Sequence, residues 1–583
     1  MRLNVFLPYA APYSDGTARR LLRALGPSWE AAPVRRIAQA LSLAIFLFLF
    51  LYIAWPYGSK DYAALRDSKE IIPAEAFLAL DPLVSLSTAA AERAWVWSLA
   101  WAGVLLAVSL VLPRMFCGYL CPLGTLVDLA DWLVGRRAAP LHLGRGGWWR
   151  HLRYYVLAGV MAAAAAGVLV SGFLAAIPVL VRGLAFVLSP VQTGAMKAWY
   201  LVPPVGAGQV VSIALFAAVF GLALLGPRFW CRTLCPSGAV FSAANALRLT
   251  ERKVTAACTK CGKCIRACTF DAIRPDFSTR PAECTFCQTC GGACPVGAIE
   301  FASRGRKSAG TLECPRPDGR GSGISRRGLL GGAAGGLAAA IGIRPSMVEG
   351  EAPADTTTPV RPPGSVREPD FLRLCIRCGL CFQACPNNVL QPMGFGGGLD
   401  GLWTPAVVAD WSGCEPSCNN CGHVCPTGAI RALEIAEKRA ARMGLAVVNG
   451  ETCLPFAGRE ACRMCVDECR MAGYDAIEFV RVGVETDADG KPIEDTGYLA
   501  PVVIAEKCVG CGLCQTRCTR INVKAKGLLA ETAVRIEAGP GKEDRLTCGS
   551  YLALREAERK AREADQKARE GQGGGAYLPD FLK

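Results

Sequence analysis

The chain has 583 residues, of which 52% are hydrophobic and 19% charged, and its formal net charge is +15. Its 30 cysteines are too small a share of so long a chain for a disulfide-stapled secreted scaffold. The high apolar content indicates contact with a lipid bilayer. The arginines lie beside apolar segments, which is typical of membrane topology signals, so we expect no nucleic-acid partner.

Four apolar runs are long enough to cross a bilayer, which takes about 20 residues of helix. We expect these spans at residues 37–55, 94–116, 154–180 and 210–229. Residues 181–200 are also apolar but include Arg182, Pro190 and Lys197. This mixture favours a helix lying in the membrane interface, with a fifth crossing as the alternative.

Arginines mark the expected cytoplasmic side of the spans. One group precedes the first run: Arg19, Arg20, Arg23, Arg35 and Arg36. Another fills the connection between the second and third runs: Arg136, Arg137, Arg145, Arg150 and Arg153. Because basic loops stay inside, we expect the N-terminus in the cytoplasm, and the chain in the cytoplasm again after the fourth run.

The three histidines exclude haem. His142 and His151 lie in a basic connection and His423 lies between cysteines, so the spans hold no histidine ligands for a b-type haem. No C-x-x-C-H sequence occurs, which excludes c-type haem. Redox cofactors in this chain must therefore be held by sulfur.

Six segments carry four cysteines each. Four of them follow C-x2-C-x2-C-x3-C: Cys258, Cys261, Cys264, Cys268; Cys284, Cys287, Cys290, Cys294; Cys375, Cys378, Cys381, Cys385; and Cys508, Cys511, Cys514, Cys518. Two have a wider first gap: Cys414, Cys418, Cys421, Cys425; and Cys453, Cys462, Cys465, Cys469. In such motifs three thiolates bind one [4Fe–4S] cluster and the fourth binds its neighbour. The spacing predicts six [4Fe–4S] clusters and disfavours zinc, whose sites combine two cysteine pairs.

Exchange of the fourth cysteine assigns ligands in the first two motifs. One cluster takes Cys258, Cys261, Cys264 and Cys294, and the other takes Cys284, Cys287, Cys290 and Cys268. The last four motifs can pair in sequence or in a nested order, outer with outer and inner with inner. Cys314 and Cys548 belong to no motif, and we expect them to be structural.

Two further pairs each follow an expected span. They are Cys117 and Cys121, and Cys231 and Cys235, both in the pattern C-x3-C-P. This spacing sets two thiols one helical turn apart. The pairs could jointly hold a cluster or another metal site, act as redox thiols or at a quinone site, or merely form structural helix ends.

The stretch Ser325-Arg326-Arg327-Gly328-Leu329-Leu330, followed by a Gly/Ala-rich apolar run, resembles a twin-arginine export signal. Iron–sulfur clusters are assembled in the cytoplasm, so a domain that follows must cross the membrane folded, as this route permits. A flexible linker is the alternative. Residues 351–369 have the composition of an extended tether.

These features predict a membrane α-helical domain with ferredoxin-like α+β iron–sulfur modules. The expected organisation is a four-span domain with both C-x3-C-P pairs (1–250), a cytoplasmic two-cluster module (251–303), a linker with a signal anchor (304–366), a periplasmic four-cluster module (367–526) and a charged tail (527–583). The protein is expected in a bacterial inner membrane, with soluble modules on both sides.

Two known families resemble the two halves. The spans with CGYLCPLG and CRTLCPSG, followed by two cluster motifs, resemble NapH-type membrane ferredoxins and their methylamine-utilisation relatives. The half that begins at SRRGLL and carries four motifs resembles NapG-type ferredoxins. Such proteins are usually separate polypeptides, and here they appear joined.

The resemblance implies a quinol-dehydrogenase-type component that takes electrons from the membrane quinol pool. They would pass through the clusters to a periplasmic reductase or cytochrome mediator. Arg228, Trp230 and Arg232 are candidates for the quinol site, with interfacial anchors as the alternative. The competing hypotheses are a redox maturation factor for a metalloenzyme, and electron input from cytoplasmic ferredoxin or nucleotide through a partner.

Overall fold

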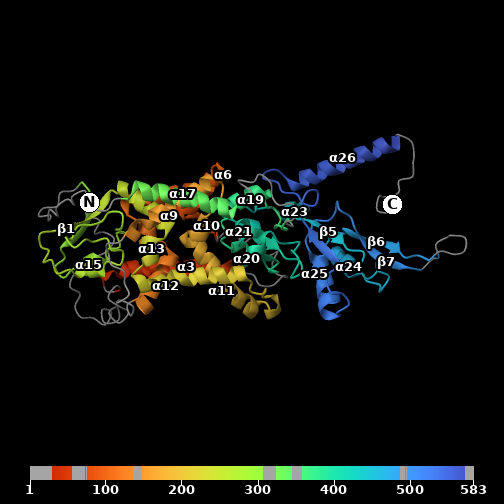
Figure 1. Cartoon of the computed structure of the whole chain (residues 1–583), viewed down its shortest axis with the longest axis horizontal. Coiled ribbons are helices and arrows are strands. Elements are labelled where there is room, and N and C mark those ends of the chain that lie inside the picture. Colours follow the sequence, from red (N-terminus) through yellow and green to blue (C-terminus); the bar gives the residue numbers. More distant parts are fainter. Residues whose placement is uncertain are drawn as a thin grey trace.

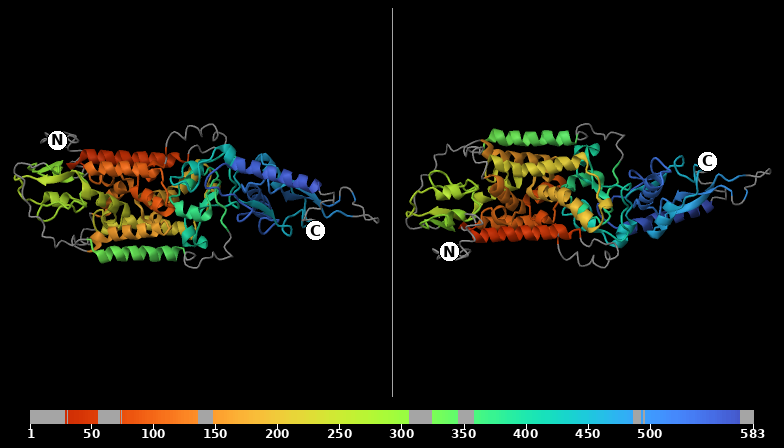
Figure 2. Two further views of the ribbon diagram at one scale, coloured as in Figure 1. Left: turned by 90° about the horizontal axis from the view of Figure 1, so that it is seen from above. Right: turned by 90° about the horizontal axis from the view of Figure 1, so that it is seen from below.

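The computed structural model describes residues 29, 31–54, 73, 75–135, 148–305, 324–344, 358–485, 493 and 496–571. In this part of the chain, a bundle of helices lies between two cysteine-rich modules (Figure 1). Both views in Figure 2 show the first module, residues 250–303, at one end of the bundle and the second module, residues 358–550, at the other. Of the predicted arginine markers, Arg19, Arg20, Arg23, Arg136, Arg137 and Arg145 lie outside the described residues.

The bundle consists of long apolar helices and short connecting helices. They are α3 (Pro33–Tyr52), α5 (Ala76–Ala79), α6 (Pro82–Glu92), α7 (Ser98–Val111), α8 (Pro122–Ala130), α9 (Leu152–Ala165), α10 (Ser171–Leu174), α11 (Ala176–Met196), α12 (Ala207–Gly221), α13 (Phe229–Thr233), α14 (Pro236–Ala244) and α17 (Arg326–Ile343). Within the described residues, three helical stretches are long and apolar enough to cross a membrane: Pro33–Tyr52, Ala176–Met196 and Ala207–Leu225. Ser98–Val111 is apolar but shorter.

The helix boundaries differ from the predicted spans at residues 154–200. The expected third span divides into α9, which ends at Ala165, the short α10 and the start of α11. Gly167, with a positive φ of 85°, and Ala175, with extended backbone, separate these helices. Residues 181–196, part of the stretch predicted to lie in the membrane interface, belong to the 21-residue helix α11, which is long and apolar enough for the alternative of a fifth crossing. Arg182 did not exclude this helix because its side chain is buried inside the protein.

Helix α17 packs on α9 through glycines. A Cβ atom on Gly336 would lie 2.0 Å from the carbonyl oxygen of Gly159, and one on Gly332 would lie 2.4 Å from that of Tyr155. These glycines, four residues apart, face the same side and let the backbones approach, as small residues do in membrane helix pairs. The segment predicted to be an export signal or a flexible linker is therefore a helix laid along the bundle.

The first module is a small α+β unit. Strands β1 (Thr250–Val254) and β2 (Ile299–Ser303) pair in antiparallel register from Thr250 opposite Ser303 to Val254 opposite Ile299. Between them lie the short helices α15 (Lys263–Ala267) and α16 (Thr289–Gly292), each carrying a cysteine of one motif. Phe286 and Phe301 meet edge to face, with ring centroids 4.9 Å apart. With so small a core, the two cysteine-rich loops make up much of the module.

The second module contains three antiparallel strand pairs and several short helices. The pairs are β3 (Leu390–Pro392) with β4 (Pro405–Val407), β5 (Leu445–Val448) with β8 (Val534–Glu537), and β6 (Ile477–Val482) with β7 (Tyr498–Val503). The helices are α19 (Glu368–Leu374), α20 (Leu380–Ala384), α21 (Gly398–Gly401), α22 (Asn420–His423), α23 (Ile435–Ala440), α24 (Met464–Met471), α25 (Leu513–Cys518) and the C-terminal α26 (Tyr551–Gly571).

This module is larger than the predicted range 367–526. At its start, buried Arg361 donates to Thr404 at 2.9 Å and pairs with Glu368, so the segment expected as a tether is packed in the module from residue 358. At its end, β8 completes a sheet with β5, and Tyr551 is fully buried. Only α26 beyond Tyr551 has the solvated, charged character predicted for the tail.

The bundle and the second module are in close contact. A Cβ atom on Gly172 of α10 would lie 2.3 Å from the carbonyl oxygen of Ile376. Arg182 of α11 donates to the carbonyl oxygens of Gly172 at 2.7 Å and Arg377 at 3.2 Å. Arg377 in turn donates to the Leu169 carbonyl at 3.1 Å. The first cysteine motif of the second module is thereby fixed against the end of the bundle.

The packing of α17 on α9 predicts opposite effects for two adjacent glycines. Gly336→Ala places a methyl group against Gly159, so we expect a loss of about 1–3 kcal/mol from overpacking. Gly335→Ala meets no atom within 4 Å and should be neutral or stabilising, because alanine favours helix. Thermal unfolding of the purified chain measures both. Equal midpoints for the two variants would contradict this packing.

Candidate iron–sulfur sites

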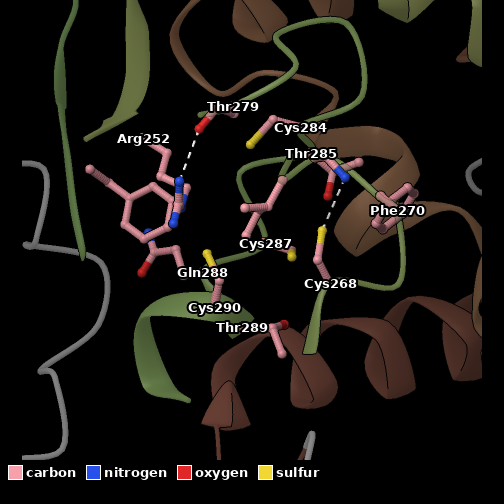
Figure 3. A pocket seen from close by; sticks show the side chains of 13 residues that line it. Arg252, Cys268, Phe270, Thr279, Cys284, Thr285, Cys287, Gln288, Thr289 and Cys290 are labelled. Atoms are coloured by element: carbon pink, nitrogen blue, oxygen red, sulfur yellow. Dashed lines mark hydrogen bonds between the residues drawn. The ribbon is translucent and has the colours of Figure 1, made fainter. Parts of the chain in front are cut away.

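The first module brings together thiols from both of its motifs. Figure 3 shows Cys268 beside Cys284, Cys287 and Cys290 around a common space of about 360 Å³. A second space, about 320 Å³, is lined by Cys258, Cys261, Cys264 and Cys294. These are the two groups that the exchange of the fourth cysteine predicted.

Burial disfavours the charged thiolate form of these cysteines when no positive charge compensates it. Burial raises the pKa of Cys268 to about 12, and the neighbouring Cys287 adds to the rise. Burial likewise raises the pKa of Cys284 to about 11. Burial also opposes ionisation of Cys287, but the charge of Arg35 and hydrogen bonds from Thr289 lower its pKa. Four buried thiolates in one space require positive charge, which the irons of a cluster supply.

Backbone N–H groups point at the exchanged cysteines. Ala272 N donates to Cys268 Sγ at 3.3 Å, and Ala298 N donates to Cys294 Sγ at the same distance. Both donors lie four residues beyond their cysteine. Hydrogen bonds to cluster sulfurs are one of the ways by which proteins set cluster potentials.

In the second module, neighbouring motifs in the sequence pair with each other. The negative charge of Cys425 contributes to the raised pKa of Cys375, Cys378 and Cys381. These four thiols therefore lie close together and form one group. Burial, with Cys425 and Cys375 adding repulsion, raises the pKa of Cys378 to about 12. The charge of Cys385 contributes instead to the raised pKa of Cys421 in the next motif. Cys385 therefore joins a second group, which consists of Cys385, Cys414, Cys418 and Cys421.

The last two motifs form a third and a fourth group. Cys453, Cys462 and Cys465 line a space of about 330 Å³ together with Cys518. Asn522 donates to both Cys462 Sγ and Cys518 Sγ at 3.7 Å. The other group contains Cys508, Cys511 and Cys514. Cys469 belongs to it, because the charge of Cys508 contributes to the raised pKa of Cys469, and that of Cys469 to the raised pKa of Cys514. This arrangement favours pairing in sequence over the nested order that the sequence left open.

The two halves of the second module are joined at their thiols. Cys414 N donates to the Cys511 carbonyl at 2.7 Å, and the Cys414 charge adds to the rise that burial causes in the pKa of Cys511. The four groups therefore follow one another in space in this order: Cys375 group, Cys385–Cys414 group, Cys469–Cys508 group, Cys453 group.

The C-x3-C-P pairs share one local design. Cys121 is the N-cap of α8 and accepts a hydrogen bond from Gly124 N at 3.4 Å. Cys235 is the N-cap of α14 and accepts from Gly238 N at 3.3 Å. In each case the proline that follows occupies the first helical turn, where its missing N–H costs nothing. A thiolate at a helix N-terminus also benefits from the helix dipole.

An arginine of each C-x3-C-P repeat packs against the other repeat. Arg228 of the second repeat donates to the Cys117 carbonyl at 3.0 Å and the Gly124 carbonyl at 3.1 Å. Arg114, at the equivalent place in the first repeat, lies 3.3 Å from where a Cβ atom on Gly238 would stand. The glycines of C-P-x-G thus leave room for the arginine of the other repeat. The charge of Cys117 acts on Cys121, Cys231 and Cys235, so the four thiols of the two pairs gather in one region.

Comparison with known proteins identifies the family. A family model described as a 4Fe-4S binding domain matches residues 94–140, 209–254 and 421–434, and a second model with this description matches residues 372–391. The methylamine utilization ferredoxin-type protein MauM of Methylorubrum extorquens is 34% identical over 234 residues, which cover 39% of this chain and 96% of that protein. The chain belongs to the MauM/NapG family of ferredoxin-type proteins.

Other relatives agree with this assignment. The ferredoxin-type protein NapG of Escherichia coli is 38% identical over 188 residues, which cover 32% of this chain and 76% of that protein. The methylamine utilization ferredoxin-type protein MauN of Methylorubrum extorquens is 31% identical over 320 residues, which cover 52% of this chain and 98% of that protein. No solved structure matches the chain. The predicted iron–sulfur electron-transfer character is confirmed at the level of the family.

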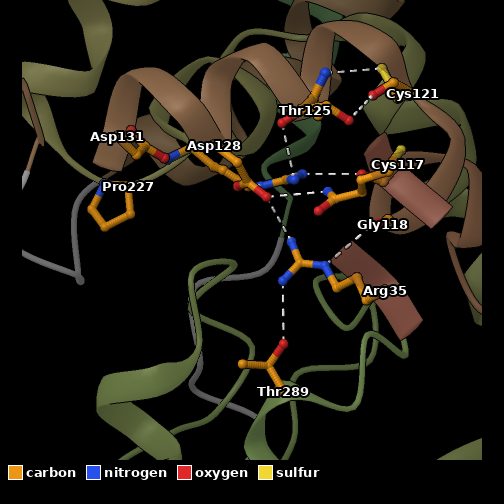
Figure 4. A network of polar contacts seen from close by, with 12 residues as sticks. Arg35, Cys117, Gly118, Cys121, Thr125, Asp128, Asp131, Pro227 and Thr289 are labelled. Carbon is orange, nitrogen blue, oxygen red and sulfur yellow. Dashed lines mark hydrogen bonds and ion pairs between the residues drawn. The ribbon is translucent and has the colours of Figure 1, made fainter. Parts of the chain in front are cut away.

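In this MauM/NapG-type chain, a buried carboxylate ties the C-x3-C-P region together. Asp128 of α8 accepts from Arg35 at 3.0 Å and Arg36 at 2.7 Å, both from α3, and pairs with Arg228 of the second repeat (Figure 4). Gln39 donates to the same carboxylate at 3.2 Å. Arg35 also donates a hydrogen bond to Thr289 Oγ1 of the first module at 3.2 Å. Sequence reasoning missed Asp128 because its partners lie about 100 residues away.

The remaining predicted residues are placed as follows. Arg228 is fully buried and ion-paired, and Trp230 is 9% exposed, so neither lies at a lipid interface as an anchor would. Cys548 is exposed and Cys314 lies outside the described residues. Among the described residues, no group of three or more His, Cys, Asp or Glu side chains is arranged to hold a single metal ion.

Pairing in sequence predicts which variants alter the same cluster. Cys385→Ser should perturb the cluster held by the Cys414 motif, and Cys518→Ser the one held by the Cys453 motif. We therefore expect Cys385→Ser and Cys414→Ser to change one shared electron paramagnetic resonance signal. Cys548→Ser, outside every motif, is the control and should retain all iron. If Cys385→Ser instead matched Cys508→Ser, the nested order would be right.

Removing the charge of Asp128 should destabilise the bundle. Asp128→Asn leaves Arg35, Arg36 and Arg228 without their shared counter-charge in a buried place. Breaking a buried ion pair by losing one partner costs about 3–5 kcal/mol. The control is Glu556→Gln on α26, where the ion pair with Arg559 is exposed and its loss should not be measurable. Thermal unfolding of both variants gives the comparison, and similar midpoints would refute the role of Asp128.

Proposed function

We propose that the protein is a membrane-bound quinol-dehydrogenase-type component that passes electrons from quinol through [4Fe–4S] clusters to a periplasmic reductase or cytochrome mediator. The observation that carries this proposal is the placement of two cysteine-rich modules at opposite ends of an apolar helical bundle (Figure 2). Three stretches of that bundle are long and apolar enough to cross a membrane. Each quinol would release two electrons to oxidised clusters and two protons to water.

The contacts support a continuous path along the long axis. Next to the first module, Tyr119 Oη donates to the Phe286 carbonyl at 3.0 Å, between the first C-x3-C-P pair and the Cys284 motif. A single apolar cluster contains Cys121, Cys235 and Cys378 together with Ile177 and Leu180. This cluster of packed side chains links the C-x3-C-P thiols to the second module.

Six regular groups of thiols support six clusters, two in the first module and four in the second. The C-x3-C-P thiols support a further one, because residues 94–140 and 209–254 match a 4Fe-4S binding model and because the two repeats interlock through Arg228. Redox-thiol chemistry on a partner is less compatible with these pairs. Cys121 is 9% exposed and Cys235 6%, so one thiol of each pair is buried away from a partner protein.

The same features support two proteins joined in one chain and a placement across the bacterial inner membrane. The chain matches MauM-type and MauN-type relatives over 39% and 52% of its length, as a NapH-type half joined to a NapG-type half would. Arg326 and Arg327 stand at the start of α17, at the same end of the bundle as the first module (Figure 1). Basic residues at that end favour a cytoplasmic first module and a periplasmic second module.

Electron transfer through the bundle can be tested by removing the C-x3-C-P thiols. In proteoliposomes, the double variant Cys117→Ala, Cys235→Ala should interrupt the path between modules. We expect quinol to reduce the clusters of one module while those of the other stay oxidised, as followed by cluster absorbance and electron paramagnetic resonance. In the unaltered chain both modules should be reduced.

Two observations would overturn the proposal. One is an unaltered chain whose clusters all stay oxidised with excess quinol of sufficiently low potential. The other is cleavage of both modules by protease added to one side of sealed vesicles, since the proposal requires residues 251–303 and 358–550 on opposite sides. Cys548→Ser serves as the control because this exposed thiol lies outside the path.

A further inference from the structure

A cavity lies where the helical bundle meets the second module. Its empty space, including the mouth, is about 740 Å³. It is bounded by α11, by the segment that leads from α11 into α12, and by α20 with the residues that follow it.

Most of the wall is apolar. The side chains that form it include Ala185, Phe186, Val205, Phe382, Leu390 and Pro392. Phe186 and Phe382 stack, with ring centroids 6.4 Å apart. Pro190, one turn beyond Phe186, also lines the cavity and has no N–H to donate to the Phe186 carbonyl. A flat ring fits such walls through stacking and dispersion contacts.

Polar side chains that line the cavity form a chain of hydrogen bonds. Ser189 donates to Gln383 Oε1, Gln383 Nε2 donates to Gln192 Oε1 at 2.7 Å, and Gln192 Nε2 donates to the Leu51 carbonyl at 3.3 Å. Gln383 is only 4% exposed. Hydroxyl and amide groups both donate and accept, so this chain suits a ligand that is a donor in one redox state and an acceptor in the other.

A second polar group lies beside the first. Asn388 Nδ2 donates to the Leu201 carbonyl at 3.1 Å and to Thr193 Oγ1 at 3.4 Å. Lys197 Nζ donates to the Pro386 carbonyl at 2.8 Å. Asn388, Thr193 and Lys197 line the cavity, and the lysine adds positive charge there. These polar groups and the apolar side chains of the wall would together fix the orientation of a ring.

Gln383 adjoins two groups of cluster cysteines. Gln383 lies between Cys381, which belongs to the Cys375 group, and Cys385, which belongs to the next group. Its Cα is two residues from each cysteine, hence at most about 7.6 Å away. A molecule bonded to Gln383 would stand beside two electron acceptors at once.

The cavity also lies at the ends of two helices long enough to cross a membrane. Trp199 and Tyr200, on the segment that joins α11 to α12, are 68% and 70% exposed. Exposed tryptophan and tyrosine at helix ends are typical of the membrane–water boundary. Val187 and Val191 of α11 are exposed beside it. A ligand with an apolar tail and a polar ring would reach the cavity from the lipid.

The geometry points to this cavity as the binding site for the ring of a membrane quinol, held by Gln383 and Ser189, an inference that rests on the proposed function. A hydroquinone hydroxyl donates to the Gln383 or Ser189 oxygen, and a quinone oxygen accepts from the second N–H of the Gln383 amide. Oxidation of one hydroquinone breaks two O–H bonds. It gives one electron to each of two oxidised [4Fe–4S] clusters and two protons to water.

This location differs from the one suggested by the sequence. Arg228 and Trp230 lie at the C-x3-C-P end, near the first module, and Arg228 is fully occupied with Asp128 and two backbone carbonyls. The cavity lies instead against the second module. Electrons from quinol would thus enter next to the module that delivers them, and the first module would be reached through the bundle.

Photolabelling tests the site directly. An azido-quinone applied to the purified holoprotein should label residues within 185–209 and 382–392, and excess ubiquinone-1 should displace it. Competition then gives the Kd of ubiquinone-1. Gln383→Met and Ser189→Ala should each raise this Kd about three- to tenfold, the effect of losing one hydrogen bond. Ser109→Ala on α7 is the matched control, because Ser109 bonds only to the Leu105 carbonyl of its own helix.

Each outcome decides the inference. Cluster absorbance reports folding, and if Gln383→Met loses it, Thr193→Val and the labelling of the unaltered chain still test the site. Label elsewhere, or cavity variants with unchanged Kd, would overturn the inference. Label that excess ubiquinone-1 does not displace would mean that the cavity holds lipid or detergent, and would also overturn it.

The same samples separate this inference from the proposed function. If quinol reduces the clusters of the unaltered chain but the label maps outside the cavity, the site is wrong and the function stands. If the label maps to the cavity but quinol never reduces the clusters, the site stands and quinol oxidation fails.

Discussion

The arrangement of the bundle around its thiols depends on one buried carboxylate. Asp128 forms ion pairs with three guanidinium groups, from Arg35, Arg36 and Arg228, which come from two distant parts of the chain. Isolated charges are costly to bury, so the carboxylate favours burial of these arginines around it. Because Arg228 also bonds to the Cys117 and Gly124 carbonyls, and Arg35 to Thr289, this ion cluster fixes the two C-x3-C-P repeats and the first module relative to α3.

A second constraint acts within the modules, where each cysteine motif is incomplete without another. Cys268 lies with Cys284, and Cys425 lies with Cys375, so neither member of a pair can complete its thiol group alone. The strands are short and the apolar cores small, as in the single pair β1 and β2. Cluster ligation would therefore contribute much of the folding free energy, as bound metals do in other small domains. Shared ligands also keep neighbouring groups close, which is what a path for electrons requires.

Local patterns in the sequence predicted what local chemistry determines. The cysteine spacings predicted the two thiol groups of the first module, because each group draws on cysteines close together in the sequence. Long-range packing was not predictable in this way. The helix α11 contains Arg182, whose charge is tolerated there because it donates to Ser212 and to the Gly172 and Arg377 carbonyls. The order of pairing in the second module and the partners of Asp128 likewise depend on residues far apart in the sequence.

The bundle also sets the distance between the modules. Helix α17 has 18 residues, hence a length of about 27 Å, close to the thickness of a bilayer's hydrocarbon core. Thiolate-bound clusters carry charge and would be costly in contact with lipid, so the protein must enclose them or hold them at the boundaries. If the bundle crosses a membrane as proposed, both conditions are met, because Cys121 and Cys235 are enclosed between helices and the two modules stand at the ends. Cys121, Cys235 and Cys378 belong to one apolar cluster that also contains Ile177 and Leu180, so packed side chains connect the enclosed thiols with the second module.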